Sequence, residues 1–327
     1  MPAGLISPPL TIESFVDAYN LNIRDFTRNV WDRRPAEYPE IAMVESTDRW
    51  IDQFMGVQGI TPPILNRDLE PIPQVAPVKG NATTIRQSTY RSQITVEETM
   101  LRTAQFKQVF DNAADALESV KTLKDFVVAN IFNNGTTGSQ TYGIVEYDGT
   151  NRALFSTGHY YENGSGTWSN YLNVNVPPNV DTVWQVAMQY LGTLKDYAGN
   201  YLRVPMNITI LTPASNPAFG VAAEEIVKSY DRPDTSDRAT NILNGPNAAL
   251  SVKHRVMVNL TSTTRWYIII SPSERAYPLR IRELESYSIT PLEKIGPANP
   301  HAYVQTLRTQ FGVGFVGSYR GIVAIGT

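Results

Sequence analysis

A stretch of nearly forty residues, 96–133, contains neither glycine nor proline. Most of it has the pattern of one long helix, because its apolar residues recur at intervals of three and four and so line one helical face. These residues are Phe106, Val109, Phe110, Ala113, Leu117, Val120, Leu123, Val127 and Ile131. At 1.5 Å per residue, a helix over residues 103–132 would be about 45 Å long. The sequence therefore predicts a strut along which the other elements are arranged, although an ordinary buried helix would show the same periodicity.

The strut helix has a polar face and a clear end. Its charged residues are Lys107, Asp111, Asp115, Glu118, Lys121 and Lys124. Asn134 and Gly135 follow, and either residue tolerates the left-handed conformation that often closes a helix. We expect the helix to end there in that conformation.

Composition excludes several classes of protein. The chain has 327 residues, enough for one large or two moderate domains, and 42% of them are hydrophobic, which suffices for a substantial core. No apolar run is long enough to span a membrane, and the first residues lack the pattern of a signal peptide. The absence of cysteine excludes disulfides and thiolate sites and fits assembly in a reducing cytoplasm. A net charge of −3 without a basic tract argues against tight electrostatic binding of nucleic acid.

The first residues predict an arm followed by a helix. Residues 1–11 contain three prolines and are typical of an extended arm. Thr11 is a candidate N-cap for a helix that ends at Arg33-Arg34-Pro35.

A ribbon is predicted between this helix and the strut. Five prolines in residues 56–80 exclude a helix or a central strand there. Residues 84–95 are rich in β-branched side chains but too polar for a core strand. We therefore expect residues 69–95 to form a two-stranded ribbon that turns near Lys79 and projects from the body. Because an isolated hairpin is marginally stable, the ribbon should lie on something, such as another subunit.

Strands and helices are both expected after the strut. In order they are a hairpin at 141–147 and 152–155, a helix at 181–197, a buried strand at 206–211, a helix at 218–229, and strands at 251–260, 265–270, 279–282 and 303–315 continuing toward 325. A long loop, 230–249, precedes the last group of strands, and loops of this length are usually functional or mobile.

The histidines do not form a recognisable site. His159, His254 and His301 are widely separated, and none has a carboxylate or a second histidine at the spacing of metal ligands. His254 lies between Lys253 and Arg255 in a predicted strand, which indicates a solvated edge.

Residues 312–317 match the dinucleotide fingerprint GxGxxG, but their context does not. The fingerprint requires a following helix and an acidic residue about twenty positions further on. Only ten residues follow Gly317, and none of them is acidic. These glycines are better explained by a bent strand or by another segment of backbone that approaches closely.

Two features leave a carbohydrate-active enzyme as an alternative. Residues 160–171 combine aromatic and amide side chains, as a sugar-binding loop would, and carboxylates occur in adjacent pairs at Glu97–Glu98 and Glu224–Glu225. Adjacent residues on a helix point in different directions, so these pairs are typical of solvated helix ends. The loop is also consistent with an ordered surface segment packed by its own aromatic side chains.

The order of elements resembles that of the major capsid proteins of tailed bacteriophages, which have the HK97-like fold. Residues 149–159, GTNRALFSTGH, with Trp168-Ser169-Asn170, resemble the stretch after the spine helix of Mu-like head subunits. Further phrases similar to those proteins are DYAGNYLRVP at 196–205, ITILTP at 208–213 and the pair Trp266-Tyr267.

The resemblance implies an α+β fold and assigns a role to each part of the chain. The implied divisions are an N-terminal arm at 1–50, an extended loop (E-loop) at 51–95, a peripheral domain with the spine helix at 96–179, an axial domain at 180–280 and returning strands at 281–327. Many relatives begin with a long charged scaffolding segment that is later removed. Here the arm begins at once, which implies a separate scaffolding protein, no scaffold, or a mature form.

The implied function is that of a major capsid protein, without enzymatic activity, cofactor or metal. Copies would assemble in the host cytoplasm into hexamers and pentamers of an icosahedral virion head that encloses double-stranded DNA, contacted non-specifically. The expected partners are further copies, a portal, and scaffolding or decoration proteins, with no membrane. An encapsulin-like nanocompartment shell is the alternative with the same fold.

Contacts between subunits are expected to involve charged residues of the arm, the ribbon and the long loop. The candidates are Arg33, Arg34, Lys79, Arg86, Arg91, Arg232, Asp234 and Asp237.

Overall fold

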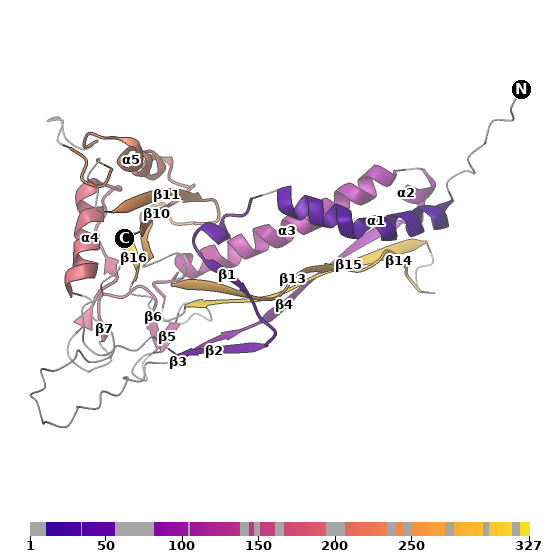
Figure 1. Ribbon diagram of the computed structural model, residues 1–327, viewed down its shortest axis with the longest axis horizontal. Helices are drawn as coiled ribbons and strands as arrows, with labels where there is room; N and C mark the ends of the chain where they lie inside the picture. The colour runs from indigo at the N-terminus through magenta and orange to yellow at the C-terminus, as the bar shows by residue number, and fades with distance from the viewer. Residues whose placement is uncertain are drawn as a thin grey trace, which may run out of the picture.

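The computed structural model describes residues 11–33, 35–55, 82–103, 105–137, 144–146, 151–160, 167–193, 207–233, 240–244, 250–271, 278–296, 301–315 and 321–327. Figure 1 shows an elongated molecule with a lobe at one end, which holds α4 and α5, and a long stem, along which α1 and α3 lie over a sheet. The helices are α1 (Ile12–Arg33), η1 (Tyr38–Glu40), α2 (Glu98–Arg102), α3 (Phe106–Asn133), α4 (Val180–Thr193) and α5 (Pro217–Lys228). Among these described helices, none has the length and apolar character needed to cross a bilayer.

The stem is built on a five-stranded sheet, called here the stem sheet. Its strands are β1 (Met43–Ser46), β4 (Ser88–Glu97), β13 (Leu279–Ile289), β14 (Glu293–Lys294) and β15 (Ala302–Phe315). β15 is central: β13, β14 and β4 all pair with it antiparallel, and β1 runs parallel to β13. β13 extends to Ile289 and is therefore much longer than the strand predicted at 279–282.

The position of β4 corrects the predicted ribbon. Residues 88–97 pair with β15 in the stem sheet, and the ribbon instead joins β2 (Ile51–Met55) to β3 (Ala82–Arg86). The segment 56–81, with the turn predicted near Lys79, lies outside the described residues. The polarity of β4 is that of an edge strand with one covered face, because Val96 is buried while Arg91 is exposed.

Two helices cover one face of the stem sheet. α3 packs on β4 and β15, and α1 lies beside α3 (Figure 1). Leu117 of α3 is buried against Leu307 of β15, so the apolar stripe of the strut faces the stem sheet. The ring of Phe110 meets three rings of α1, those of Phe15, Tyr19 and Phe26. α1 begins as predicted, because the Ser14 backbone N–H donates to Thr11 Oγ1 at 3.2 Å.

The strut ends where predicted, but Asn134 and Gly135 do not adopt the left-handed conformation that was expected there. Asn134 has φ −99°, and the one glycine with positive φ among the described residues is Gly326. Gly135 is instead a point of close approach, because a Cβ there would lie 2.4 Å from the ring of Phe155. Lys124, predicted on the polar face, is fully buried and meets Glu283 of β13.

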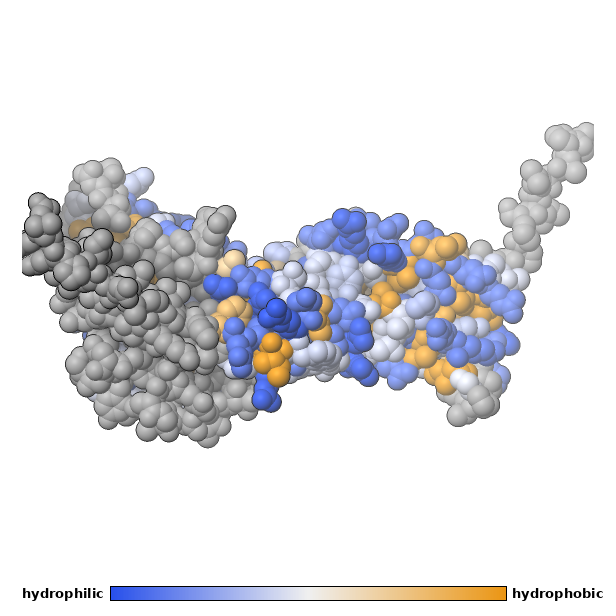
Figure 2. Space-filling view, turned by 60° about the horizontal axis from the view of Figure 1, so that its bottom comes forward, coloured by the Kyte–Doolittle hydropathy of each residue, from blue (hydrophilic) through white to orange (hydrophobic). Residues whose placement is uncertain are grey.

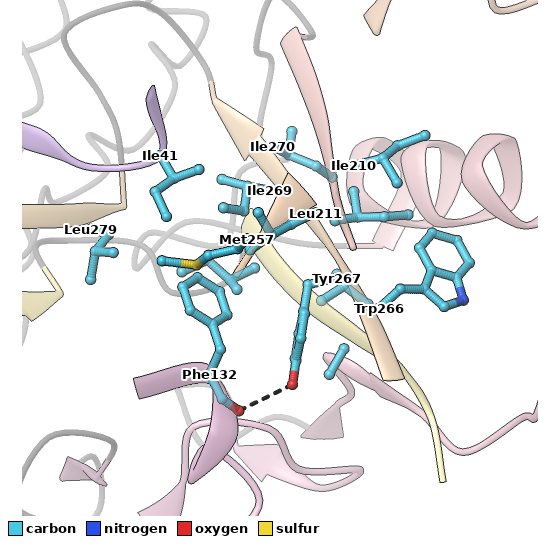
Figure 3. Packing of buried hydrophobic residues seen from close by; sticks show 14 of the residues in the cluster. Ile41, Phe132, Ile210, Leu211, Met257, Trp266, Tyr267, Ile269, Ile270 and Leu279 are labelled. Atoms are coloured by element: carbon cyan, nitrogen blue, oxygen red, sulfur yellow. Dashed lines mark hydrogen bonds between the residues drawn. The ribbon is translucent and has the colours of Figure 1, made fainter. Parts of the chain in front are cut away.

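The lobe is built on a second five-stranded sheet, the lobe sheet. In spatial order its strands are β11 (Ser251–Met257), β10 (Asn207–Pro213), β12 (Arg265–Ser271), β16 (Ile322–Gly326) and β9 (Tyr171–Leu172). Figure 3 shows how the end of α3 meets this sheet: the Tyr267 hydroxyl donates to the Phe132 carbonyl at 3.2 Å. Burial raises the pKa of Tyr267 to about 12, so the hydroxyl remains a donor. One apolar core therefore joins the strut to the lobe.

The remaining predicted elements are largely confirmed. α4 and α5 occupy the predicted helical segments on either side of β10, and β5 (Ile144–Glu146) pairs with β6 (Asn151–Ala153) as the predicted hairpin. β7 (His159–Tyr160) and β8 (Thr167–Trp168) form a short antiparallel pair in and beside the predicted loop at 160–171.

Candidate assembly surfaces

A cluster of charged side chains fixes the base of the β2–β3 ribbon on the stem sheet. Asp52 of β2 is buried, and its carboxylate accepts from Arg282 Nε at 2.9 Å. Arg282 Nη1 reaches Glu45 Oε2 at 2.6 Å, and Arg280 reaches the same carboxylate at 3.1 Å. Burial alone would lower the pKa of Arg282, but Asp52 and Glu45 raise it. Sequence reasoning missed this cluster because its members lie far apart in the chain.

The ribbon crosses the stem sheet at two glycines of β15. A Cβ at Gly312 would lie 2.3 Å from the carbonyl oxygen of Arg86 and 2.6 Å from Gln87 Oε1. At Gly314 it would lie 2.7 Å from the side chain of Ile85, which is buried. The predicted close approach of another backbone segment is confirmed at Gly312, whereas at Gly314 the approaching group is a side chain. Both glycines belong to the GxGxxG match, so the sequence did mark this side of the contact.

Replacing Gly312 by valine should lift the ribbon from the stem sheet. The new side chain would overlap backbone of β3, so the ribbon must move, at a cost of about 1–3 kcal/mol in the free energy of unfolding. Hydrogen exchange of the amides in residues 51–55 and 82–86 should then become faster, while exchange in α3 stays unchanged.

Gly296 offers the matched control for this substitution. A Cβ at Gly296 would meet nothing within 4 Å, so Gly296→Val should leave exchange in the ribbon at the wild-type rate. Equal protection of the ribbon in the two variants would contradict the described contact at Gly312.

Two of the predicted contact residues lie on exposed parts of the ribbon and the stem. Arg86 ends β3 and is exposed, and Arg91 is exposed on β4 directly opposite Arg308 of β15. Arg308 pairs with Glu285 at 2.6 Å, whereas Arg91 makes no ion pair within the described part of the chain. Like charges placed opposite each other on two strands destabilise a sheet. We therefore expect Arg91 to lower the stability of the isolated subunit slightly.

The face of the stem that carries the sheet is mostly polar. Figure 2 brings the lower side of Figure 1 forward and shows hydrophilic side chains along much of the stem, with smaller apolar patches between them. Among the large apolar side chains described in the stem, the most exposed is on its helical side, where Leu21 of α1 is 81% exposed. Both faces of the stem therefore offer surface for contacts.

The base of the long loop is held against the lobe. Asp231 and Thr240 form an isolated β-bridge, and buried Asn241 donates to the carbonyls of Ile226 and Ser229 at 2.7 and 2.9 Å. Arg232, a predicted contact residue, is bonded within the subunit to Asp181 of α4 at 2.7 Å.

The other predicted contact residues are Arg33, Arg34, Lys79, Asp234 and Asp237. Arg33 is the last residue of α1. Arg34, Lys79, Asp234 and Asp237 lie outside the described residues.

β11 is an edge strand of the lobe sheet and Lys253 and Arg255 are exposed, as expected, but the side chain of His254 between them is largely covered. Its Nδ1 lies 2.7 Å from Glu224 of α5 and its Nε2 lies 2.8 Å from Thr212 Oγ1 of β10, with the ring 6% exposed. A hydroxyl, an imidazole and a carboxylate in a row are the parts of a hydrolytic triad. Thr212 is fully buried, however, so a substrate cannot reach its hydroxyl. The row of hydrogen bonds instead holds α5 on β10 and β11.

The other sequence candidates for chemistry are also engaged in structural contacts. His159 is buried, stacks on Trp168 and shares a hydrogen bond with Asn170 at 3.0 Å. Trp168 is itself buried, so it is not an exposed platform for a sugar ring. Within the described part of the chain, no cluster of histidine and carboxylate side chains is suited to hold a metal ion.

Comparison with known proteins identifies the fold. A chain from the procapsid of bacteriophage JBD30 is similar over 96% of this chain and 75% of its own length, with a TM-score of 0.52 and 13% identity. The capsid of cyanophage P-SCSP1u gives a TM-score of 0.52 at 9% identity, covering 90% and 88% of the two chains. The capsid of an empty GTA particle gives 0.51 at 11% identity, covering 90% of each. The chain has the HK97-type capsid fold. No family model matches the sequence, and no curated protein does so either.

The likeness covers at least nine-tenths of the chain in each comparison. At 9–13% identity the likeness rests on the mixed α+β architecture and not on individual side chains.

Proposed function

We propose that this chain is the major capsid protein of a tailed bacteriophage. The observation that carries the proposal is the fold, shared over 90–96% of the chain with subunits of phage and GTA capsids. In this proposal, copies assemble into hexamers and pentamers of an icosahedral head that encloses double-stranded DNA. A portal and scaffolding or decoration proteins are the further partners.

The parts of the subunit have separate roles in this proposal. The expected division is 1–50 for the N-terminal arm, 51–95 for the extended loop, 96–179 for the peripheral domain with α3 as its spine, 180–280 for the axial domain and 281–327 for the returning strands. Within 51–95, β4 belongs to the stem sheet, so the extended loop itself is the segment from β2 to β3. The long loop at 231–247 would surround the axis of the ring, and its firmly bonded base on α5 supports such a role. Head-to-tail contacts of this kind close into rings, as a capsomer requires.

Electron microscopy of the purified protein tests the proposal. Closed particles of uniform diameter are expected, alone or after addition of the scaffolding protein. A monodisperse monomer at high concentration, with scaffold supplied, would overturn it. The content of particles from the native source separates the two kinds of shell: DNA indicates a phage head, and an enclosed enzyme indicates a nanocompartment.

The exposed arginines provide a test of the contact surface. Replacing Arg86 and Arg91 by alanine should leave a folded subunit that assembles poorly, because both side chains are exposed and lack ion pairs within the described residues. The free energy of unfolding should change by no more than about 0.5 kcal/mol, and removal of Arg91 relieves repulsion by Arg308. Thermal unfolding and sedimentation velocity measure the two effects.

Lys107 is the matched control for these arginines. It is an exposed basic residue of α3 and belongs to neither the ribbon nor the stem sheet. Lys107→Ala should assemble as the wild type does, and normal assembly of both arginine variants would show that these side chains are not at a contact.

A further inference from the structure

β13 carries two extra residues opposite β15. Glu283 pairs with Phe311, Glu285 with Gln310 and Ser288 with Arg308. Between the first and the last of these pairs, β13 takes five steps along the chain and β15 takes only three. Bulges of this kind bend a strand and increase its twist. This double bulge lies between the part of β13 that pairs with β1 and the part that runs toward β14.

The polar groups freed by the double bulge are bound by two side chains. Lys124 Nζ of α3 donates to Glu283 Oε1 at 2.6 Å and to the Ser286 carbonyl at 3.3 Å. Thr309 Oγ1 lies 3.1 Å from the Glu285 carbonyl and 2.8 Å from that of Ser286. Ser286 Oγ also donates to the second oxygen of Glu283. The carbonyl oxygens of Glu285 and Ser286, in the irregular stretch of β13, are therefore bound by side chains of α3 and β15.

The same turn of α3 also holds the connection that follows α1. The ammonium group of Lys124 lies 5.1 Å from the ring of Trp31 in α1 and 5.7 Å from that of Tyr38 in η1. Asp125, the next residue, accepts the backbone N–H groups of Glu37 and Tyr38 at 3.0 and 2.7 Å. Two adjacent residues of the strut thus fix β13 on one side and η1 on the other.

Stability alone does not explain a buried ion pair at this point. Lys124 is 0% exposed and Glu283 is 7% exposed, and removing two charges from water offsets most of what their attraction gains. Burial lowers the pKa of Lys124, an effect that the Glu283 carboxylate opposes. An apolar pair of similar volume would stabilise the fold equally well, but it could not bind the carbonyls of the bulge.

We propose that the Lys124–Glu283 pair sets the bend of the stem sheet and, through it, the curvature of the shell. The inference rests on the proposed capsid function. The ribbon base, at Asp52 and Arg282, lies on one side of the bulge, and β14 lies on the other. The bend therefore fixes the directions in which these two ends of the stem meet neighbouring copies. In a closed assembly of identical subunits, those directions determine whether the contacts close and at what diameter.

The test replaces the pair by two methionines, Lys124→Met with Glu283→Met. The subunit should fold with a melting temperature within a few degrees of the wild type. Amides of residues 283–288 should exchange roughly tenfold faster, because the Ser286 carbonyl and the Ser286 hydroxyl lose their bonds to the pair. Its particles should show a broader range of diameters, or open sheets, in electron micrographs.

The matched control replaces a surface ion pair of the stem in the same way, Arg102→Met with Glu98→Met. These residues pair at 2.8 Å on α2, with Arg102 66% exposed. The control should retain both the exchange rates of residues 283–288 and the wild-type diameter.

A second variant, Thr309→Val, covers the case in which the methionine pair does not fold. It removes the other donor to the bulge carbonyls and changes no charge, and it should broaden the diameters in the same direction. Wild-type diameters in both variants would overturn the inference while leaving the capsid function intact. Failure of the wild type itself to form particles would overturn the capsid function, and the exchange rates would still show whether the pair fixes the bulge.

Discussion

Replacing Leu117 by aspartate should leave no folded subunit. Leu117 lies in the middle of α3, 1% exposed, and packs with Val120 and Leu307 between the strut and the stem sheet. Loss of its buried side chain costs about 2–5 kcal/mol, and a carboxylate without a partner in an apolar site costs several more. The total approaches the entire stability of about 5–15 kcal/mol of an ordinary domain. Circular dichroism and the soluble fraction on expression measure the loss.

Leu21 offers a control with the same chemical change. It lies on α1 in the same stem but is 81% exposed, so Leu21→Asp should fold with nearly the wild-type melting temperature. A cooperative unfolding transition in the Leu117 variant, close to that of the wild type, would contradict the packing of α3 on the stem sheet.

Helices were predicted well because their pattern is local. The 3.6-residue period of apolar residues in the strut arises because one face of α3 is covered along its 28 residues. The period can therefore be read from the sequence of the helix alone. The Thr11 cap and the ends of α5 follow equally from neighbouring residues. Local pattern does not identify the partner of a strand, so β4 was assigned to the ribbon although it pairs with β15, more than 200 residues away.

Polar residues were the least predictable part of the candidate surfaces. Lys124 and His254 look like solvated charges in the sequence. Lys124 is nevertheless fully buried and the His254 side chain is only 6% exposed, because a partner from another element reaches each of them. The separation is 159 residues for Lys124 and Glu283, and 30 for His254 and Glu224. The cluster around Asp52 and Arg282 was missed for the same reason. Of the eight contact candidates, Arg86 and Arg91 are placed on exposed surface, whereas Arg232 is bonded within its own lobe.

Replacing Lys124 alone by methionine should destabilise the subunit far more than replacing the pair. The single change leaves the Glu283 carboxylate buried between α3 and β13 without its counter-ion. Breaking a buried pair in this way costs about 3–5 kcal/mol, whereas exchanging both partners for apolar groups is often neutral. Urea unfolding of the wild type, the single variants and the pair gives the coupling energy as a double-mutant cycle.

A second change distinguishes an unpaired charge from a simple packing defect. Adding Glu283→Gln to Lys124→Met removes the charge and keeps the size of the side chain, and a neutral amide is much less costly to bury than a carboxylate. The double variant should therefore recover most of the stability that Lys124→Met loses, as measured by urea unfolding. A loss that Glu283→Gln does not relieve would show that Lys124 acts by filling space, and that the charge on Glu283 is balanced by some other group.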